Sequence, residues 1–177
     1  ENQIVVAPGA NRSLSLDGLS IPETDAAICQ LEVPVDTVAA VARAYRGFLC
    51  VNLAPAMHVD VSILQRADLV VVNETESAWY GGSLAACGGL VATTRGSGVA
   101  TLARNGEIVA EATPPTVDAV DTTGAGDTFT AALTVALVEG RPPEAALGFA
   151  CAAAAAATTR MGAQPALPYR EDVISGE

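Results

Sequence analysis

The sequence predicts an α/β fold with a mostly parallel sheet flanked by helices, and three observations support this prediction. Short, continuous apolar runs alternate with longer segments of helical period, a pattern typical of strands buried on both faces. Polar residues directly follow several of these runs, at the sheet edge where ligands of such folds gather. Half of the 177 residues are hydrophobic, enough for one core, so residues 1–177 are treated as a single domain.

Four strands and two helices are predicted in the first half of the chain. The strands are Ile4–Ala7, Ala26–Leu31, Phe48–Leu53 and Leu69–Val72. Val35–Tyr45 is predicted to be a helix because Val38 and Val41 recur at helical spacing. Val61–Arg66 is predicted to be a second, shorter helix. A turn cluster at Pro8–Asn11 follows the first strand.

The second half is predicted to contain a hairpin and two long helices. Its predicted strands are Leu90–Thr93, Val99–Ala103 and Glu107–Ala112, followed by a strand-like segment at Val117–Val120. The pair Asn105-Gly106 favours a tight turn and hence the hairpin. The helices are Asp127–Glu139, whose apolar composition indicates burial, and Glu144 to about Arg160, which begins after two prolines.

Composition excludes several classes of function. The formal net charge is −11, which argues against nucleic acid and against an anionic membrane surface as partners. All nine basic residues are arginine, so a P-loop lysine and any lysine nucleophile are excluded. His58 is the single histidine, which excludes a His-rich metal site and leaves little basis for a Ser-His-Asp triad.

The cysteines and the apolar runs indicate a cytoplasmic location. Cys29, Cys50, Cys87 and Cys151 are widely spaced without a C-x-x-C pair, as expected for reduced thiols. No signal peptide is visible, and the longest apolar run, near Ala145–Ala157, is too short to span a bilayer. The sequence begins without Met inside a strand-like pattern, so we expect it to be incomplete at its N-terminus.

The run Asp121–Phe129, with sequence DTTGAGDTF, is the chemical centre of the chain. Its glycines fall just before a predicted helix, where backbone N–H groups of Gly124, Ala125 and Gly126 can converge on an anion. Asp127 follows in the first helical turn. An anion hole beside a carboxylate is what phosphoryl transfer to an alcohol requires. The plainer alternative is that Asp127 is only a helix cap or a partner of the helix dipole.

Two further segments suit the same chemistry. Asn73 and Glu76 follow a predicted strand and share a helical face, so they could contact a hydrated Mg²⁺; the alternative is an Asn cap with an acidic first turn. Thr94, Arg95, Gly96, Ser97 and Gly98 form a Gly-rich turn that fails the P-loop pattern. Taken alone, this turn is better explained as the entry to the hairpin.

DTTGAGDTF resembles the C-terminal signature of the ribokinase family, the pfkB-type sugar and nucleoside kinases. The resemblance extends from Glu1-Asn2 to about Tyr169, and it implies a ribokinase-like fold with ATP and Mg²⁺ as cofactors. It implies that Asp127 is the general base, Gly124–Gly126 the anion hole, and Glu76 an Mg²⁺ contact through water.

The resemblance also assigns expected binding positions. Nucleotide contacts are implied for Asn73, the turn Thr94–Gly98, Gly126 and Cys151, and a sugar contact for Glu32 alongside Asp127. Positions that hold K⁺ in the family, chiefly through carbonyl oxygens, are Asp121, Thr123, Ala157, Arg160 and Gly162. Ala166 stands where the family often has a hydroxyl, which weakens the expectation of K⁺.

The chain departs from the family in two places. The N-terminal sugar-binding segment and the lid are missing, so a homodimer or a partner chain that supplies the missing segment is expected. Between Asn73 and Thr94 the family has a full helix, whereas this chain has Gly81–Gly89, so that face of the sheet is expected to be exposed or covered by a partner.

These observations favour ATP-dependent phosphorylation of a sugar hydroxyl, with ribose converted to ribose 5-phosphate. Ribose is favoured because the segments Glu1–Asn11, Glu32 and Arg160–Pro168 look most like ribokinase. The alternatives are a truncated or degenerate nucleotide-binding domain without kinase activity, and another sugar or nucleoside kinase of the family. A Rossmann-type dinucleotide domain is disfavoured because neither glycine cluster completes G-x-G-x-x-G.

Overall fold

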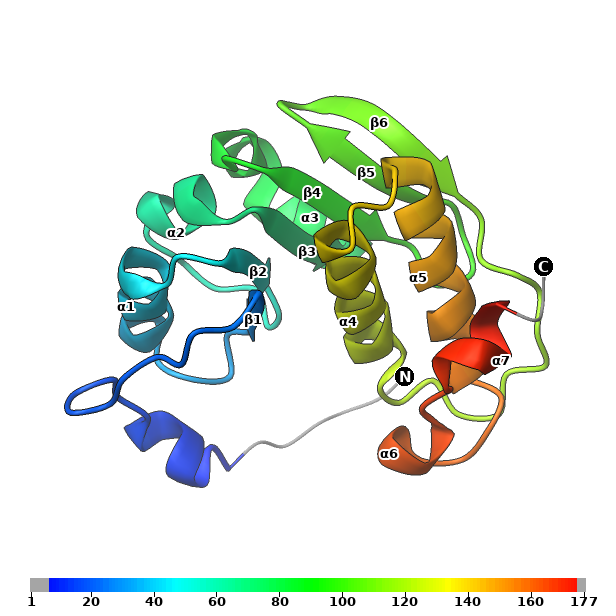
Figure 1. The fold of residues 1–177 in the computed structure, drawn as a ribbon, viewed down its shortest axis with the longest axis horizontal. Coiled ribbons are helices and arrows are strands. Elements are labelled where there is room, and N and C mark those ends of the chain that lie inside the picture. The colour runs from blue at the N-terminus through cyan, green and yellow to red at the C-terminus, as the bar shows by residue number, and fades with distance from the viewer. Residues whose placement is uncertain (1–6, 175–177) are drawn as a thin grey trace.

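A computed structural model of the chain describes residues 7–174. Six strands form one sheet in the order β1-β2-β3-β4-β5-β6 (Figure 1). Their bounds are β1 Ala26–Cys29, β2 Phe48–Asn52, β3 Leu69–Asn73, β4 Leu90–Thr94, β5 Ala100–Arg104 and β6 Glu107–Ala112. Strands β1 to β4 are parallel, and β5 and β6 continue the sheet as an antiparallel hairpin. The predicted α/β fold with a mostly parallel sheet is confirmed.

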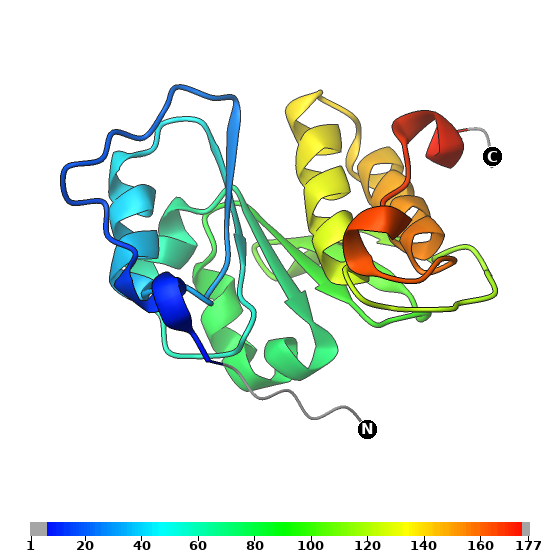
Figure 2. The same ribbon diagram turned by 90° about the horizontal axis from the view of Figure 1, so that it is seen from below.

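Helices cover both faces of the sheet. On one face lie α1 Val35–Ala44, α2 Val61–Arg66, α3 Glu74–Tyr80 and the 3-10 helix η2 Gly81–Ala86. On the other face α4 Ala125–Val138 and α5 Pro143–Ala157 pack side by side (Figure 1). Three short elements remain: η1 Gly9–Ser13, α6 Ala163–Ala166 and α7 Arg170–Ile174. Figure 2 shows the same two helical layers from below, with η1 on the side of α1 and α2.

Alternation along the strands builds two cores. In β2, Leu49 and Val51 pack under α1 and α2, whereas Cys50 between them belongs to the core under α4. Burial raises the pKa of the Cys50 thiol to about 12, so this group stays protonated. All four cysteines are free thiols, with Cys29 half-buried and the other three buried.

Most predicted elements are confirmed to within two or three residues, with two exceptions. Ile4–Ala7 lies outside the described residues apart from Ala7. The prediction of a strand-like segment at Val117–Val120 is wrong, because these residues form no strand. Instead the Val120 N–H donates to the Thr158 carbonyl at 2.8 Å, at the end of α5. The preceding Pro114-Pro115 pair has no N–H to offer a sheet ladder, which explains the difference.

The segment between Asn73 and Thr94 covers its sheet face more fully than the sequence suggested. Tyr80 of α3 and Cys87 after η2 are buried in the core over β3, and Leu84 packs against the same core. The Tyr80 hydroxyl donates to the Met57 carbonyl at 2.8 Å, which ties α3 to the segment before α2. In the hairpin, Ile108 is 59% exposed and Val109 is 37% exposed.

Backbone contacts fix the start of β4. Gly88 N–H donates to the Leu64 carbonyl at 3.0 Å, and Leu90 N–H to the Asp68 carbonyl at 2.9 Å. A β-carbon on Gly89 would lie 2.1 Å from the Asp68 carbonyl oxygen, so only glycine fits there. Within residues 7–174, no helix is long and apolar enough to cross a membrane.

Candidate functional site

The predicted site residues gather at one edge of the sheet because of its topology. Strands β1 to β4 end at a common edge, and β6, parallel in direction to β4, ends there too. The chain then leads through residues 113–124 into the N-terminus of α4. Helix α5, which packs against α4, brings its C-terminus back to the same edge. The carboxyl edge of the sheet therefore carries a helix start, a helix end and five strand ends.

At the N-terminus of α4, two backbone N–H groups have no acceptor among the described residues. Gly124 is the N-cap, with φ of 80°, a conformation that favours glycine. Ala125 N–H donates to the Thr122 carbonyl at 3.2 Å, and Thr128 N–H to the Gly124 carbonyl at 2.9 Å. Among the described residues no acceptor is found for the N–H groups of Gly126 and Asp127. These two amides, on the positive end of a helix, are free to donate to an anion.

Asp127 is exposed in the first turn of α4, beside these amides. No described side chain pairs with its carboxylate, so the group is available to a ligand. The carboxylate lies at the positive end of the helix dipole. A carboxylate next to an anion site can accept a proton from an alcohol that approaches the bound anion.

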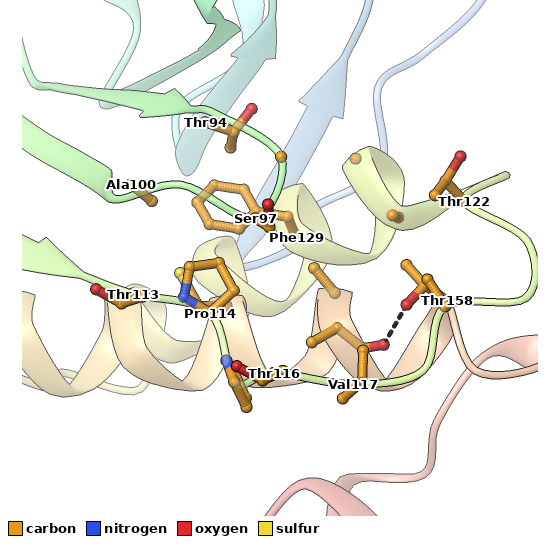
Figure 3. A pocket seen from close by; sticks show the side chains of 18 residues that line it. Thr94, Ser97, Ala100, Thr113, Pro114, Thr116, Val117, Thr122, Phe129 and Thr158 are labelled. Atoms are coloured by element: carbon orange, nitrogen blue, oxygen red, sulfur yellow. Dashed lines mark hydrogen bonds between the residues drawn. The ribbon is translucent and has the colours of Figure 1, made fainter.

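A cavity of about 510 Å³ opens directly from this helix start. Thr122, Ala125 and Gly126 form its end at α4, and one face of α5 forms its floor. That face consists of Cys151, Ala154, Ala155 and Thr158, spaced at i, i+3, i+4 and i+7. A strap of chain that carries Pro114, Thr116 and Val117 also lines the cavity, and Figure 3 shows it in front of α5.

The Gly-rich turn after β4 contributes part of this cavity. Thr94, Gly96 and Ser97 line it, and Figure 3 places Thr94 and Ser97 on the side away from the strap. Arg95 and Gly98 are not among its lining residues. The Arg95 guanidinium instead donates to the Val99 carbonyl at 2.9 Å, and Gly98 N–H to the Arg95 carbonyl at 2.8 Å, so both close the turn.

Cys151 lies in the cavity floor, as the predicted nucleotide-side position requires. Its side chain is 1% exposed, and burial raises its pKa to about 11. The thiol is therefore neutral at physiological pH and acts as a small apolar wall with a weak S–H donor.

Asn73 and Glu76 form a capping box at the start of α3. The Asn73 side-chain oxygen accepts from Glu76 N–H at 2.8 Å, and Glu76 Oε2 accepts from Asn73 N–H at 2.7 Å. The capping alternative raised by the sequence is thus present in the structure. The second oxygen of Glu76 and the amide NH₂ of Asn73 remain for other partners. A carboxylate oxygen suits Mg²⁺ through water, so the donor set fits that ion.

Asp121 fastens the loop before α4 to the loop after α5. One carboxylate oxygen accepts from Thr123 N–H at 2.9 Å and from its hydroxyl at 2.6 Å, and the other accepts from Gly162 N–H at 2.8 Å. These bonds lower the pKa of Asp121, the Thr123 hydroxyl having the largest effect.

The expected K⁺ positions meet at this loop pair. Asp121 and Thr123 stand on one side, and Ala157, Arg160 and Gly162 on the other. Among the described backbone hydrogen bonds, none uses the carbonyl oxygens of these five residues as acceptors. Carbonyl oxygens that accept no backbone hydrogen bond fit a monovalent cation, because such ions take neutral oxygen ligands.

Asp121→Asn is expected to lower the thermal midpoint of unfolding at neutral pH. A carboxyl with a depressed pKa in the folded state stabilises above its ordinary value of 3.8, and the contribution is lost as pH falls through the folded-state pKa. The gap between wild type and variant should therefore narrow below pH 3.8. Thermal unfolding followed by circular dichroism checks this, with Asp118→Asn as the exposed control; a gap that is constant with pH would contradict it.

Glu32 stands apart from the cavity. It follows β1, its side chain is exposed, and its N–H donates to the side chain of Gln30. The structure places it at the carboxyl edge but does not bring it into contact with the α4 N-terminus. Sequence reasoning missed the strap Pro114–Val117 and the small residues Ala154 and Thr158. The spacing of these two with Cys151 along a helix was the signal that could have found them.

Fold and site together define an α/β protein with an anion-binding helix N-terminus above an elongated cavity. A model described as pfkB family carbohydrate kinase matches residues 9–170. The chain therefore belongs to the pfkB family of carbohydrate kinases, whose members are phosphotransferases with an alcohol acceptor.

Similar proteins of known sequence are ribokinases. The chain is 35% identical over 188 residues to ribokinase of Bacillus subtilis and 32% identical over 196 residues to that of Haemophilus influenzae. Each alignment covers 98% of this chain and 64% of the relative. The chain thus spans less than two thirds of the length of these relatives.

Solved structures agree with this family. Ribokinase from Thermotoga maritima superposes with a TM-score of 0.84 at 33% identity, over 99% of this chain and 65% of that structure. Arabidopsis thaliana ribokinase complexed with ribose and ATP gives 0.78 at 31% identity, over 85% of this chain and 55% of that structure.

Proposed function

We propose that this chain is the nucleotide-binding and catalytic part of a cytoplasmic sugar kinase that transfers the γ-phosphoryl group of ATP to ribose, giving ribose 5-phosphate. The observation that supports this most is the pair of unspent amides of Gly126 and Asp127 beside an exposed carboxylate, at the mouth of the cavity. The similar Arabidopsis ribokinase, complexed with ribose and ATP, supports the choice of both substrates.

Each part of the site has a role in this reaction. The cavity takes the nucleotide, with its phosphates at Gly126 and the turn of Thr94, Gly96 and Ser97. The amides at the start of α4 stabilise the charge that develops on the phosphoryl group. Asp127 accepts the proton of the attacking hydroxyl.

The remaining roles concern the sugar and the ions. Glu32, exposed at the carboxyl edge, binds sugar hydroxyls. Glu76, through water, and Asn73 would hold Mg²⁺, which would supply positive charge to the phosphates. The carbonyl oxygens near Asp121 hold K⁺, which would stiffen the loop that carries the anion-binding amides.

The test is a pair of measurements on this chain. Calorimetry should detect ATP binding in the presence of Mg²⁺, and a coupled assay should detect ribose-dependent ADP release. ADP release without ribose dependence, or no ATP binding at all, would refute the kinase proposal. Ribose should also be compared with fructose and adenosine, because another sugar or nucleoside kinase of the family is the nearest alternative.

A nucleotide-binding domain without kinase activity is the second candidate. The observation in its favour is that Glu32, the predicted sugar contact, is not among the residues that line the cavity. ATP binding with no ADP release on any sugar would select this candidate. Light scattering of the same sample would show whether the chain is a homodimer, and co-purification would show a partner chain.

Gly126→Ala is expected to weaken ATP binding roughly tenfold or more while the fold stays intact. An added β-carbon meets no protein atom within 4 Å, yet Gly126 lines the cavity that is proposed to take the nucleotide. Gly148→Ala, likewise unobstructed but not among the residues lining the cavity, is the matched control. Titration calorimetry measures the ATP affinity of both variants. Equal affinities would show that the phosphates of ATP do not bind at this helix start.

A further inference from the structure

Helix α4 is apolar for most of its length, yet it carries three threonines whose hydroxyls bond to its own backbone. Thr128, Thr130 and Thr134 each donate through the side-chain hydroxyl to the carbonyl four residues earlier, at 2.8, 2.8 and 2.7 Å. All three residues are buried. Threonine is a weaker helix former than alanine or leucine, and hydroxyl bonds of this kind slightly destabilise a helix. Helix stability is therefore a poor explanation for these bonds.

The Thr130 bond reaches the helix start that borders the cavity. Its acceptor is the Gly126 carbonyl oxygen. This carbonyl and the Asp127 N–H belong to one planar peptide unit, so a donor that fixes the oxygen also fixes the direction of the N–H. The Asp127 N–H is one of the two amides that have no acceptor among the described residues. Thr130 thus holds a peptide unit whose N–H is free to donate to a ligand.

The other two hydroxyls hold peptide units whose N–H groups are already used. Thr128 binds the Gly124 carbonyl, and the N–H of that peptide unit donates to the Thr122 carbonyl at 3.2 Å. Thr134 binds the Thr130 carbonyl, and the N–H of that unit lies inside the helix, where the regular pattern gives it an acceptor. Of the three bonds, the one made by Thr130 is therefore the one that acts on an available donor.

The Thr130 hydroxyl also changes the strength of this donor. In an α-helix the Gly126 carbonyl accepts from the Thr130 N–H, so the hydroxyl is a second donor to the same oxygen. Each added bond polarises the peptide unit, and cooperative strengthening amounts to about 10–30% per bond. Thr130 is 2% exposed and is not among the residues that line the cavity. Its hydroxyl can therefore act on a ligand only through the peptide unit that ends in the Asp127 N–H.

We propose that Thr130 is a positioning residue for phosphoryl transfer, because its hydroxyl orients and polarises the peptide unit whose Asp127 N–H stabilises charge on the transferred group. The inference rests on the function proposed above and deepens it. A backbone donor of this kind is worth about 10²–10³ in turnover, so a change of 10–30% in its strength corresponds to about two- to eightfold. Since the charge develops in the transition state, the effect falls on kcat and not on the KM for ATP.

Thr130→Val removes the hydroxyl and keeps the shape of the side chain. In steady-state assays of ribose-dependent ADP release, this variant is expected to lower kcat about two- to eightfold with an unchanged KM for ATP. Thr130→Ser keeps the hydroxyl and should restore kcat. Thr134→Val loses the same kind of bond one turn further along the helix, away from the cavity, and should keep the wild-type kcat. Equal kcat in the two valine variants, a change in KM alone, or no restoration by serine overturns the inference.

Nuclear magnetic resonance gives a readout that needs no turnover. In the isotope-labelled wild-type chain, addition of Mg²⁺-ATP should shift the Asp127 amide resonance, and the shift should be smaller in Thr130→Val than in Thr134→Val. If the wild-type chain releases no ADP with ribose, the sugar-kinase proposal fails and this comparison alone decides the inference. Equal shifts in the two variants, or an Asp127 amide that does not respond in the wild-type chain, overturn the inference and leave ATP binding at the cavity to the calorimetric test.

Discussion

Asp127→Asn is expected to lower ribose-dependent ADP release by about a thousandfold, with little change in ATP affinity. Asparagine keeps the size of the side chain but cannot accept the hydroxyl proton. The proposed ATP contacts are backbone N–H groups and the cavity walls, which the substitution leaves in place. A coupled assay gives the turnover, and calorimetry gives the affinity.

A matched control comes from another helix. Asp36 is also an exposed aspartate in a first helical turn, that of α1, and Asp36→Asn should leave turnover unchanged. Retained turnover in the Asp127 variant would refute its role as base. Loss of turnover together with loss of ATP binding would point instead to collapse of the helix start.

Gly89→Ala is expected to lower the free energy of unfolding by about 3 kcal/mol, at the upper end of the cost of overpacking. The new β-carbon would lie 2.1 Å from the Asp68 carbonyl oxygen. This oxygen already accepts from Leu90 N–H at 2.9 Å, so relief of the clash breaks the bond that starts β4. Urea unfolding followed by fluorescence of the single Trp79 measures the effect.

Gly82→Ala is the control for this experiment. A β-carbon on Gly82 meets no atom within 4 Å, and the residue is exposed in η2. Its effect should stay within about 0.5 kcal/mol. Equal unfolding midpoints for the two variants would show that β4 can shift to accommodate the methyl group.

The elements that the sequence predicted well are those with a strong local signal. The helix Val61–Arg66 matches to the residue, and the turn at Asn105-Gly106, with φ of 53° and 81°, joins β5 and β6 as predicted. Gly124 of DTTGAGDTF lies at the helix start, where its φ of 80° requires a residue that tolerates positive φ.

What the sequence could not predict depends on tertiary contacts. The Val117–Val120 segment has an apolar, strand-like pattern, but its backbone pairs with the end of α5 rather than with a strand. The hydrogen bond from Gly162 N–H to the Asp121 carboxylate joins residues 41 positions apart, which no local pattern reveals. Arg66 likewise donates to the Gly47 carbonyl at 2.7 Å and to Asp68 at 2.8 Å, and composition alone gives no hint of this.

In the capping box at α3, Glu76 accepts a backbone hydrogen bond and is also the proposed contact of a metal ion. The Glu76 carboxylate is 9% exposed and is already oriented by the Asn73 N–H before any ligand arrives. A hydrated cation that meets the second oxygen therefore finds a side chain whose rotational freedom was lost during folding. The entropy of ordering the Glu76 side chain is therefore lost during folding and not during ion binding. Such preorganisation favours tight binding of the ion through few contacts.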